Sequence, residues 1–118
     1  MEDPTEVRPW GSFKVIHDGS KFKVKIIEVL PGKRLSYQSH SRRAERWTMV
    51  SGNARVVIDG SESVHSPGDV VLIGQGQKHR LINDQSDILI LVEVQIGDYF
   101  GEDDIERFED DFGRVELA

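Results

Sequence analysis

The chain of 118 residues contains no cysteine, and this absence excludes several kinds of chemistry at once. Without a thiol there is no disulfide, no thiolate nucleophile and no zinc site built on sulfur ligands. Apolar residues never run on for the roughly eighteen positions that a membrane-spanning helix needs. The first residues also lack the basic and apolar stretches of a secretory signal peptide. We therefore expect a cytoplasmic protein without a membrane segment.

Negative charge is concentrated at one end of the chain. The net charge is −6, but residues 98–118 hold nine acidic side chains against Arg107 and Arg114. Residues 1–97 are nearly neutral, with 12 acidic and 13 basic side chains. Several of their bases form a cluster in the sequence: Lys33, Arg34, Arg42, Arg43 and Arg46. Such a cluster suits a small anionic ligand, whereas nucleic acid would need a basic surface at the scale of the whole domain.

Short runs of alternating or continuous apolar residues fill most of the chain, separated by turns that contain glycine or proline. The expected strands are 22–30, 34–40, 45–50, 54–58, 70–73 and 88–96. After the run 54–58, Asp59-Gly60 indicates a tight hairpin, because both central positions of that turn take positive φ. This pattern is typical of an all-β sandwich or closed barrel. The length fits one domain over residues 1–118, with a core at about 8–97.

Only the acidic tail, residues 98–118, has a helical pattern. Ile105, Phe108 and Phe112 recur at i, i+3 and i+7 behind acidic residues of the kind that favour a helix start. We expect a short amphipathic helix that packs on the barrel as a cap and leaves its charges in water.

Four side chains have the chemistry and spacing of metal ligands. His40, Glu45 and His79 offer two imidazoles and a carboxylate, a set that suits a divalent transition metal with coordination positions left open. Gln38 lies two residues before His40, so on a strand both would point to one face. The alternative is a set of ordinary polar strand residues. For the metal we expect one divalent ion, with zinc preferred and manganese, cobalt, iron and nickel as alternatives.

Other charged and polar residues are candidates for catalysis or substrate binding. Arg43 and Arg80 could hold a phosphate or a developing oxyanion, because a guanidinium offers forked donors; the alternative is a solvated surface arginine. Strict alternation would turn Arg80 away from its neighbour His79. Lys25 and Glu93 are charged residues within apolar runs, so each is either a barrel-lining acid or base with a shifted pKa or part of an exposed face or edge. Gln95, which interrupts the same run as Glu93, is a candidate substrate contact.

Two glycine-bounded stretches resemble the paired signature of the cupin superfamily, G-x5-H-x-H-x4-E-x6-G and G-x5-P-x-G-x2-H-x3-N. The matching positions are Gly32, Gln38, His40, Glu45 and Gly52, and then Gly68, Gly74, Gly76, His79 and Asn83. Gln38 stands where the first histidine is usual, and Gly74 where proline is usual. The resemblance implies a jelly-roll β-barrel with the metal at its mouth.

Longer motifs are similar to the type II mannose-6-phosphate isomerase domain, which usually forms the C-terminal half of bifunctional enzymes that also carry a mannose-1-phosphate guanylyltransferase. They span about residues 8–114: Arg8-Pro9-Trp10-Gly11-Ser12-Phe13, Arg43-Ala44-Glu45-Arg46-Trp47, Ser51-Gly52, His79-Arg80-Leu81, Glu93-Val94-Gln95, Gly101-Glu102-Asp103-Asp104-Ile105, Arg107-Phe108-Glu109-Asp110 and Phe112-Gly113-Arg114. Glutamine is usual in that family at the position of Gln38. Ser41, Arg42 and Arg46 depart from a run that is richer in histidine, which changes the substrate rim but not the metal set.

The resemblance implies a metal-dependent isomerase that interconverts mannose 6-phosphate and fructose 6-phosphate, with Glu93 or Lys25 as the base and arginines on the phosphate. It also implies a homodimer. One alternative is a non-catalytic cupin that binds a sugar phosphate or a nucleotide sugar, and another is a small iron oxygenase, which Gln38 supports less well than histidine would. Nucleotidyl transfer is not expected, because the chain has no glycine-rich phosphate loop followed by lysine.

Overall fold

The computed structural model describes residues 5–114, and all regular elements in that range are β-strands. They are β1 (Thr5–Arg8), β2 (Gly11–Asp18), β3 (Phe22–Val29), β4 (Tyr37–Ser39), β5 (Arg43–Ser51), β6 (Ala54–Ile58), β7 (Ser61–His65), β8 (Val70–Ile73), β9 (His79–Ile82), β10 (Leu89–Gly97) and β11 (Glu106–Glu109). No membrane-spanning helix is found in the described range. The expected all-β architecture is thus confirmed.

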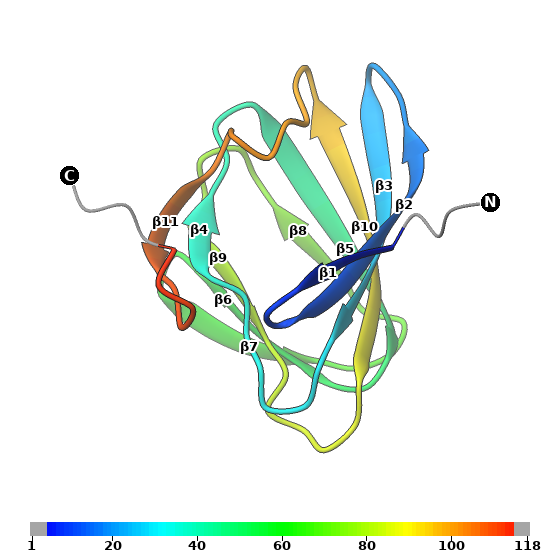
Figure 1. Ribbon diagram of the computed structural model, residues 1–118, viewed down its shortest axis with the longest axis vertical. Helices are drawn as coiled ribbons and strands as arrows, with labels where there is room; N and C mark the ends of the chain where they lie inside the picture. Colours follow the sequence, from blue (N-terminus) through cyan, green and yellow to red (C-terminus); the bar gives the residue numbers. More distant parts are fainter. Residues whose placement is uncertain (1–4, 115–118) are drawn as a thin grey trace.

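The strands form two antiparallel sheets that enclose the core (Figure 1). The first has the order β1-β2-β3-β10-β5-β8 and the second the order β11-β4-β9-β6-β7. Buried hydrophobic side chains from both sheets fill the space between them, among them Ile27, Trp47, Met49, Leu81 and Leu91. Burial of this apolar surface is the main favourable contribution to folding. The core is therefore shared by strands that lie far apart in the sequence.

Side-chain alternation along the central strand β10 places polar groups inside the barrel. Leu89 and Leu91 point inward, and so do Glu93 and Gln95 further along the same strand. Glu93 lies opposite Lys25 of β3 on one side and opposite Trp47 of β5 on the other. Cross-strand neighbours on one face are close enough to interact directly. Strand register thus brings the charged residues of separate strands together.

The hairpin predicted at Asp59-Gly60 connects β6 and β7. Ile58 pairs with Ser61, and the two residues between them have φ values of 47° and 83°. Positive φ at both central positions is the requirement of a type I′ turn, which matches the twist of the flanking strands.

Two expectations from the sequence need correction. The expected strand over 34–40 contains regular pairing only in β4, together with an isolated bridge between Arg34 and Ile82. Ser36 and His40 are buried, whereas the guanidinium of Arg34 binds Asp111 at the surface.

The predicted C-terminal helical cap is wrong. Within the described part of the tail the chain makes turns and the strand β11, which pairs with β4; residues 115–118 lie outside the described range. A helix would leave the backbone groups of β4 unpaired on that side, whereas a strand satisfies them. Phe108 contacts Tyr37 edge-on, and Phe112 packs against the core. The tail therefore does fold back on the barrel, but by strand pairing.

Candidate metal centre

A cavity opens between the two sheets and is lined by both apolar and charged side chains. Phe13, Ile27 and Trp47 form part of its wall, and Gln38, His40, Arg43, Glu45 and His79 lie along it with Lys25, Glu93 and Glu102. Most of these polar side chains are buried. Burial of so many ionisable groups is costly unless they are paired or bind a ligand, so the cavity is the candidate functional site.

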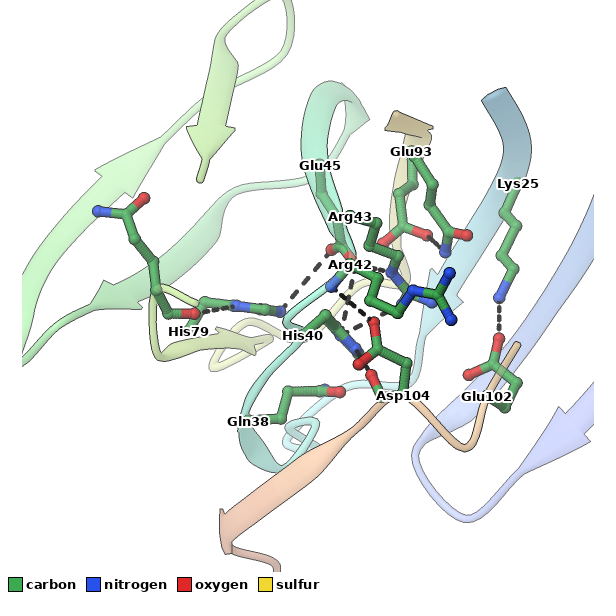
Figure 2. A network of polar contacts seen from close by, with 12 residues as sticks. Lys25, Gln38, His40, Arg42, Arg43, Glu45, His79, Glu93, Glu102 and Asp104 are labelled. Carbon is green, nitrogen blue, oxygen red and sulfur yellow. Dashed lines mark hydrogen bonds and ion pairs between the residues drawn. The ribbon is translucent and has the colours of Figure 1, made fainter. Parts of the chain in front are cut away.

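His40, Glu45 and His79 form a compact buried cluster with potential ligand atoms all within 4.8 Å of one another (Figure 2). Glu45 projects from β5 and His79 from β9, while His40 follows the last residue of β4. His40 Nε2 lies 3.4 Å from one Glu45 carboxylate oxygen, and His79 Nε2 lies 3.7 Å from the other. The cluster could therefore bind a metal ion between two imidazole nitrogens and a carboxylate.

Backbone carbonyl groups hold both imidazole rings in the orientation that metal binding requires. His40 Nδ1 is 2.7 Å from the carbonyl oxygen of Asp104, and His79 Nδ1 is 3.0 Å from that of Gln77. A carbonyl can only accept, so Nδ1 carries the proton and Nε2 presents its lone pair to the cluster. Burial, together with the Arg43 guanidinium, lowers the pKa of His40, although Glu45 acts in the opposite direction. Neutral imidazole is the form that binds a metal.

Glu45 is held as a carboxylate by its neighbours. Burial alone would raise its pKa, but the nearby His79 and Arg43 side chains hold the pKa of Glu45 well below its ordinary range. Arg43 Nε donates to Glu45 Oε2 at 2.8 Å, and Trp47 Nε1 donates to Oε1 at 3.0 Å. An ionised carboxylate beside two imidazole rings fits a divalent cation in charge and in donor type.

Gln38 is placed next to this cluster by strand pairing. It pairs with His79 across β4 and β9, and its half-buried side chain lines the cavity. Its amide nitrogen lies 3.4 Å from the carbonyl oxygen of Ser36. Figure 2 shows the Gln38 side chain beside His40. Its role as a fourth metal ligand stays a prediction.

Arg43 has an unused hydrogen-bond donor inside the site. Its side chain is only 4% exposed, and Nη2 lies 3.2 Å from His40 Nε2. Nη1 is buried without a hydrogen-bond partner. A buried donor without a partner carries a free-energy cost, which a bound oxygen atom would remove. The guanidinium is therefore positioned to bind an oxygen of a ligand close to the histidine and glutamate cluster.

Glu93 and Gln95 are buried side chains on β10 that contact each other. Gln95 Nε2 donates to Glu93 Oε1 at 2.6 Å, and Trp47 Nε1 is 3.2 Å from Glu93 Oε2. Burial, reinforced by the Glu45 carboxylate, raises the pKa of Glu93 well above its ordinary range. Gln95 is fully buried, and its Oε1 has no hydrogen-bond partner. Glu93 thus contacts Trp47, which also binds Glu45, and Gln95 holds the Glu93 carboxyl group.

Lys25 points into the cavity on the side away from His79 (Figure 2). Its ammonium group forms an ion pair with Glu102 at 2.5 Å and lies 4.3 Å from the centre of the Phe13 ring. The Lys25 side chain is 5% exposed, whereas that of Glu102 is 52% exposed. A buried base and a solvent-facing carboxylate therefore meet at the cavity.

Arg80 is not brought to this cavity. Alternation along β9 turns it to the other face, where it binds the carbonyl of Leu35 and both the side chain and the carbonyl of Glu109. There it lines a separate surface depression with Arg34 and Tyr37. Its contact with a substrate stays a prediction, and this position gives it no access to the His40 cluster.

Sequence reasoning missed the contribution of the connection between β10 and β11. This segment supplies Glu102 to Lys25 and the Asp104 carbonyl to His40, and the Asp104 carboxylate accepts bonds from the backbone of Ser41 and Arg42. The motif Gly101–Ile105 was the available signal. The sequence pattern instead predicts an acidic helix there, with its charges in water.

Comparison with known proteins agrees with this fold. Residues 2–110 match the family model described as "Mannose-6-phosphate isomerase C-terminal". The alginate biosynthesis protein AlgA of Pseudomonas aeruginosa is 47% identical over 108 residues, which cover 92% of this chain and 22% of that protein. The mannose-1-phosphate guanylyltransferase of Escherichia coli is 44% identical, with coverage of 92% and 23%. The chain thus spans about a fifth of the length of these relatives.

Solved structures support the barrel architecture. The Schizosaccharomyces pombe Cnp3 cupin domain superposes with a TM-score of 0.71 at 12% identity, covering 74% of this chain and 64% of that one. At this identity the similarity establishes the cupin fold alone. Taken with the match over nearly the whole chain and with the buried His40, Glu45 and His79 cluster, it leads to one conclusion: the chain belongs to the mannose-6-phosphate isomerase C-terminal family of cupin domains.

Proposed function

We propose that the chain is a metal-dependent isomerase that interconverts mannose 6-phosphate and fructose 6-phosphate. The observation that carries this proposal is the buried His40, Glu45 and His79 cluster on the wall of a cavity in a member of this family. The relatives are much longer than this chain, so the proposal concerns the reaction of this domain and no other activity of theirs.

Three residues and a predicted fourth would hold the metal ion. His40 and His79 would contribute Nε2, Glu45 a carboxylate oxygen and Gln38 its amide oxygen, and we propose zinc as the ion. A divalent ion held there supplies positive charge that stabilises negative charge on the oxygen atoms of C1 and C2 of the sugar. The carbonyl contacts to the two Nδ1 atoms support this assignment, because they direct both Nε2 atoms inward.

Arg43 is the residue that we assign to the reacting oxygens. Its buried Nη1 needs an acceptor, and the nearest ligand oxygen in the site would provide one. A guanidinium at this place would stabilise the anionic oxygen of an enediolate more strongly than the starting carbonyl, which is the requirement for lowering the barrier. It would also orient the sugar relative to the base.

The proton transfer is assigned to the pair Lys25 and Glu102. Aldose to ketose conversion removes a proton from C2 and returns one to C1, and a second proton moves from the C2 hydroxyl to the C1 oxygen. One base on the open side of the cavity can serve both carbons. Glu102 is 52% exposed and pairs with Lys25 at the cavity, whereas Glu93 is buried and hydrogen-bonded to Gln95 and Trp47. Glu93 is therefore reassigned as a positioning residue for Glu45 and Trp47.

The phosphate is assigned to arginines at the same cavity. Arg8, Arg107 and Arg114 line it with Arg43, and they add positive charge around a space that a phosphorylated sugar would enter. Guanidinium groups match phosphate oxygens well because of their forked donors. Arg80, on the other face of β9, is not required in this scheme.

The test is a coupled assay of fructose 6-phosphate formation from mannose 6-phosphate. Protein from which a chelator has removed the metal should be inactive. It should regain activity with at least one divalent metal when several are tested separately. If the protein is inactive with zinc, manganese, cobalt, iron and nickel, the proposed isomerase activity is contradicted. Mannose 1-phosphate serves as the control sugar, because its C1 oxygen is blocked and it cannot isomerise.

One observation favours a second candidate function, a non-catalytic sugar-phosphate-binding domain. Arg43 Nη2 contacts His40 Nε2, the atom that a metal needs, so Arg43 must release His40 before the ion binds. A binding domain would use the guanidinium without a metal. Calorimetry of the chelator-treated protein with mannose 6-phosphate separates the two: binding without metal, and no turnover with any metal, would establish the binding domain.

A further inference from the structure

The outer face of the second sheet carries a surface depression that the proposed reaction does not use. It has a volume of about 240 Å³, and its walls come from all five strands of that sheet and from the segment before β4. Alternation along β9 separates it from the metal centre, because His79 faces the cavity and Arg80 faces the depression. A ligand in the depression would therefore lie on the opposite side of β9 from the His40, Glu45 and His79 cluster.

Strand register brings a buried guanidinium group into this depression. Val57 of β6 pairs with Arg80 of β9 on one side and with Glu62 of β7 on the other. At the far edge of the sheet, Tyr37 of β4 pairs with Glu109 of β11. The Arg80 side chain is only 4% exposed, although it lies on the outer face. A buried guanidinium needs partners for its charge and its donors, from the protein or from a ligand.

The contacts of Arg80 with the protein use only part of its donor capacity. Its Nε donates to the Leu35 carbonyl at 2.9 Å, while Nη1 and Nη2 donate to the side chain and the carbonyl of Glu109 at 3.0 and 3.1 Å. A guanidinium has five N–H groups, so these three bonds leave two without a partner in the described range. Arg34 lines the same depression and donates to Asp111 through Nε and Nη2, which leaves its Nη1 outside these bonds. Two guanidinium groups with unused donors thus share one depression.

The Tyr37 phenol adds a third donor. The Gly60 amide donates to the phenol oxygen at 3.1 Å, so the oxygen acts as the acceptor there and its own proton can bind a ligand. Val57 and Ile82 contribute apolar side chains to the same depression. Donors from three side chains beside an apolar surface suit a small organic anion with several oxygen atoms.

Carboxylates of the tail now occupy both guanidinium groups from the solvent side. The Glu109 side chain is 67% exposed and binds Arg80, and the Asp111 side chain is 42% exposed and binds Arg34. An exposed carboxylate can turn into water, whereas Arg80 is buried and would be left as an uncompensated charge. Departure of the Glu109 carboxylate is therefore favourable only when another anion takes its place.

We propose that the depression is a second ligand site, which takes the phosphate group of a small molecule in exchange for the Glu109 carboxylate. A phosphate group has more charge and more acceptor oxygens than a carboxylate, so it can bind Arg80 and Arg34 together. A free carboxylate has no such advantage over Glu109, which is held beside Arg80 at high effective concentration. The Glu62 carboxylate opposes an anion, but Arg55 lies 3.5 Å from it and offsets part of its charge. The site stands independently of the proposed isomerase reaction.

The test is a titration of ¹⁵N-labelled protein with inorganic phosphate at constant ionic strength, followed by nuclear magnetic resonance. The Gly60 amide and the Arg80 Nε–H group belong to the depression, and both signals should shift and saturate. The Trp47 indole N–H lies at the cavity and reports binding there separately. Acetate should leave the signals of the depression unchanged, because a carboxylate does not displace Glu109. Methyl phosphate, titrated in the same way, shows whether the site takes phosphate monoesters as well as the free ion.

Two pairs of variants test the exchange. Glu109→Gln removes the competing charge and should lower the dissociation constant of phosphate by about tenfold, as expected when the free site is populated at about 10% in the wild type. Glu106→Gln, an exposed carboxylate on the same strand, is the matched control. Arg80→Lys should weaken binding, whereas Arg46→Lys, at an exposed position on β5 of the other sheet, should not.

Three results would overturn the proposal. The first is the absence of a saturable shift at Gly60 with either phosphate probe. The second is a response to acetate equal to the response to phosphate. The third is a phosphate affinity that neither Glu109→Gln nor Arg80→Lys changes; since Glu109 is exposed, its variant gives a clear result even if Arg80→Lys folds poorly.

Discussion

Arg43 Nε lies 2.8 Å from Glu45 Oε2, and both side chains are almost fully excluded from solvent, at 4% and 2% exposure. The two residues are two positions apart on β5, so alternation directs both inward. The guanidinium keeps Glu45 ionised, and its remaining donor, Nη1, faces the site without a partner. A ligand oxygen that reaches the cluster would therefore meet both the Glu45 site and Arg43.

Replacement of this guanidinium should reduce catalysis without removing the metal. We expect Arg43→Ala to lower kcat/KM by an amount worth about 2 kcal/mol or more, the scale of losing a charge-assisted bond to a buried anion. Arg43→Lys should restore only part of the lost kcat/KM, because an ammonium group lacks the forked donors of a guanidinium. Arg55→Ala is the control: this arginine binds Asp84 and Glu62 on the surface, and its loss should change activity and stability by less than about half a kcal/mol. Wild-type kinetics in Arg43→Ala would remove Arg43 from the mechanism.

Metal binding should depend on the two clustered histidines. His40→Ala and His79→Ala should each lose most of the bound zinc after dialysis against the metal, measured by elemental analysis. His65→Ala should keep it, because His65 contacts Ser63 and Asp69 outside the cavity. Gln38→Ala should weaken metal binding less than His40→Ala or His79→Ala does, since a neutral amide oxygen is the weakest donor of the set. Full metal content in both cluster variants would place the ion elsewhere.

Asp104 should act on the metal through the His40 ring. Its carbonyl accepts from His40 Nδ1 and its carboxylate holds the backbone of Ser41 and Arg42, so the contact to the ring depends on this anchored turn. We expect Asp104→Ala to reduce metal affinity by about 10–100-fold, the usual cost of losing a group that orients a ligand. Asp103→Ala, on the same connection but bonded to Tyr99, is the control. Equal metal affinity in the two variants would argue against this role.

Substitution of Glu102 and substitution of Glu93 should cause different defects, the first in catalysis and the second in metal binding. Glu102→Gln should lower kcat by about 100-fold or more with metal content unchanged, because a general base of this kind contributes that much. Glu93→Gln should instead alter metal binding, through Trp47 and Glu45. Glu106→Gln, an exposed carboxylate of the same tail, is the control for charge alone. A normal kcat in Glu102→Gln would exclude it as the base.

The tail should contribute to stability. Deletion of residues 99–118 should lower the melting temperature clearly, because it removes β11 from the edge of β4. In a milder test, Phe112→Ala should lower the free energy of unfolding by about 1–3 kcal/mol, below the cost at a fully buried site because Phe112 is half-buried. Val64→Ala, at an exposed position, should cost little. An unchanged melting temperature after the deletion would mean that the tail does not support the barrel.

Alternating and apolar runs in the sequence predicted six of the eleven described strands, and residue type and spacing predicted the cluster of His40, Glu45 and His79. The expected runs 54–58 and 70–73 coincide with β6 and β8, and the Asp59-Gly60 turn has the predicted backbone angles. The separation of His79 from Arg80 onto different faces also followed from alternation alone. These features are local, because strand geometry and turn chemistry act over a few residues.

The tail shows where local patterns fail. Ile105, Phe108 and Phe112 have a helical spacing, yet the segment forms β11 because the edge of β4 offers backbone partners that only the folded barrel presents. A weak preference for helix is easily overridden by such pairing. The same placement brings Glu102 to Lys25 and Asp104 to His40, across 77 and 64 positions of the chain.

The β architecture, the family and the cluster of His40, Glu45 and His79 could be predicted from the sequence, because each depends on side-chain type and on spacing along the chain. The set of charged residues that share the cavity could be seen only in the folded chain, since it depends on strand register and on the path of the connection between β10 and β11. The fold places Arg80 outside the cavity and brings Glu102 and the Asp104 carbonyl to Lys25 and His40. Such relations join strands distant in sequence, and the fold alone brings them together.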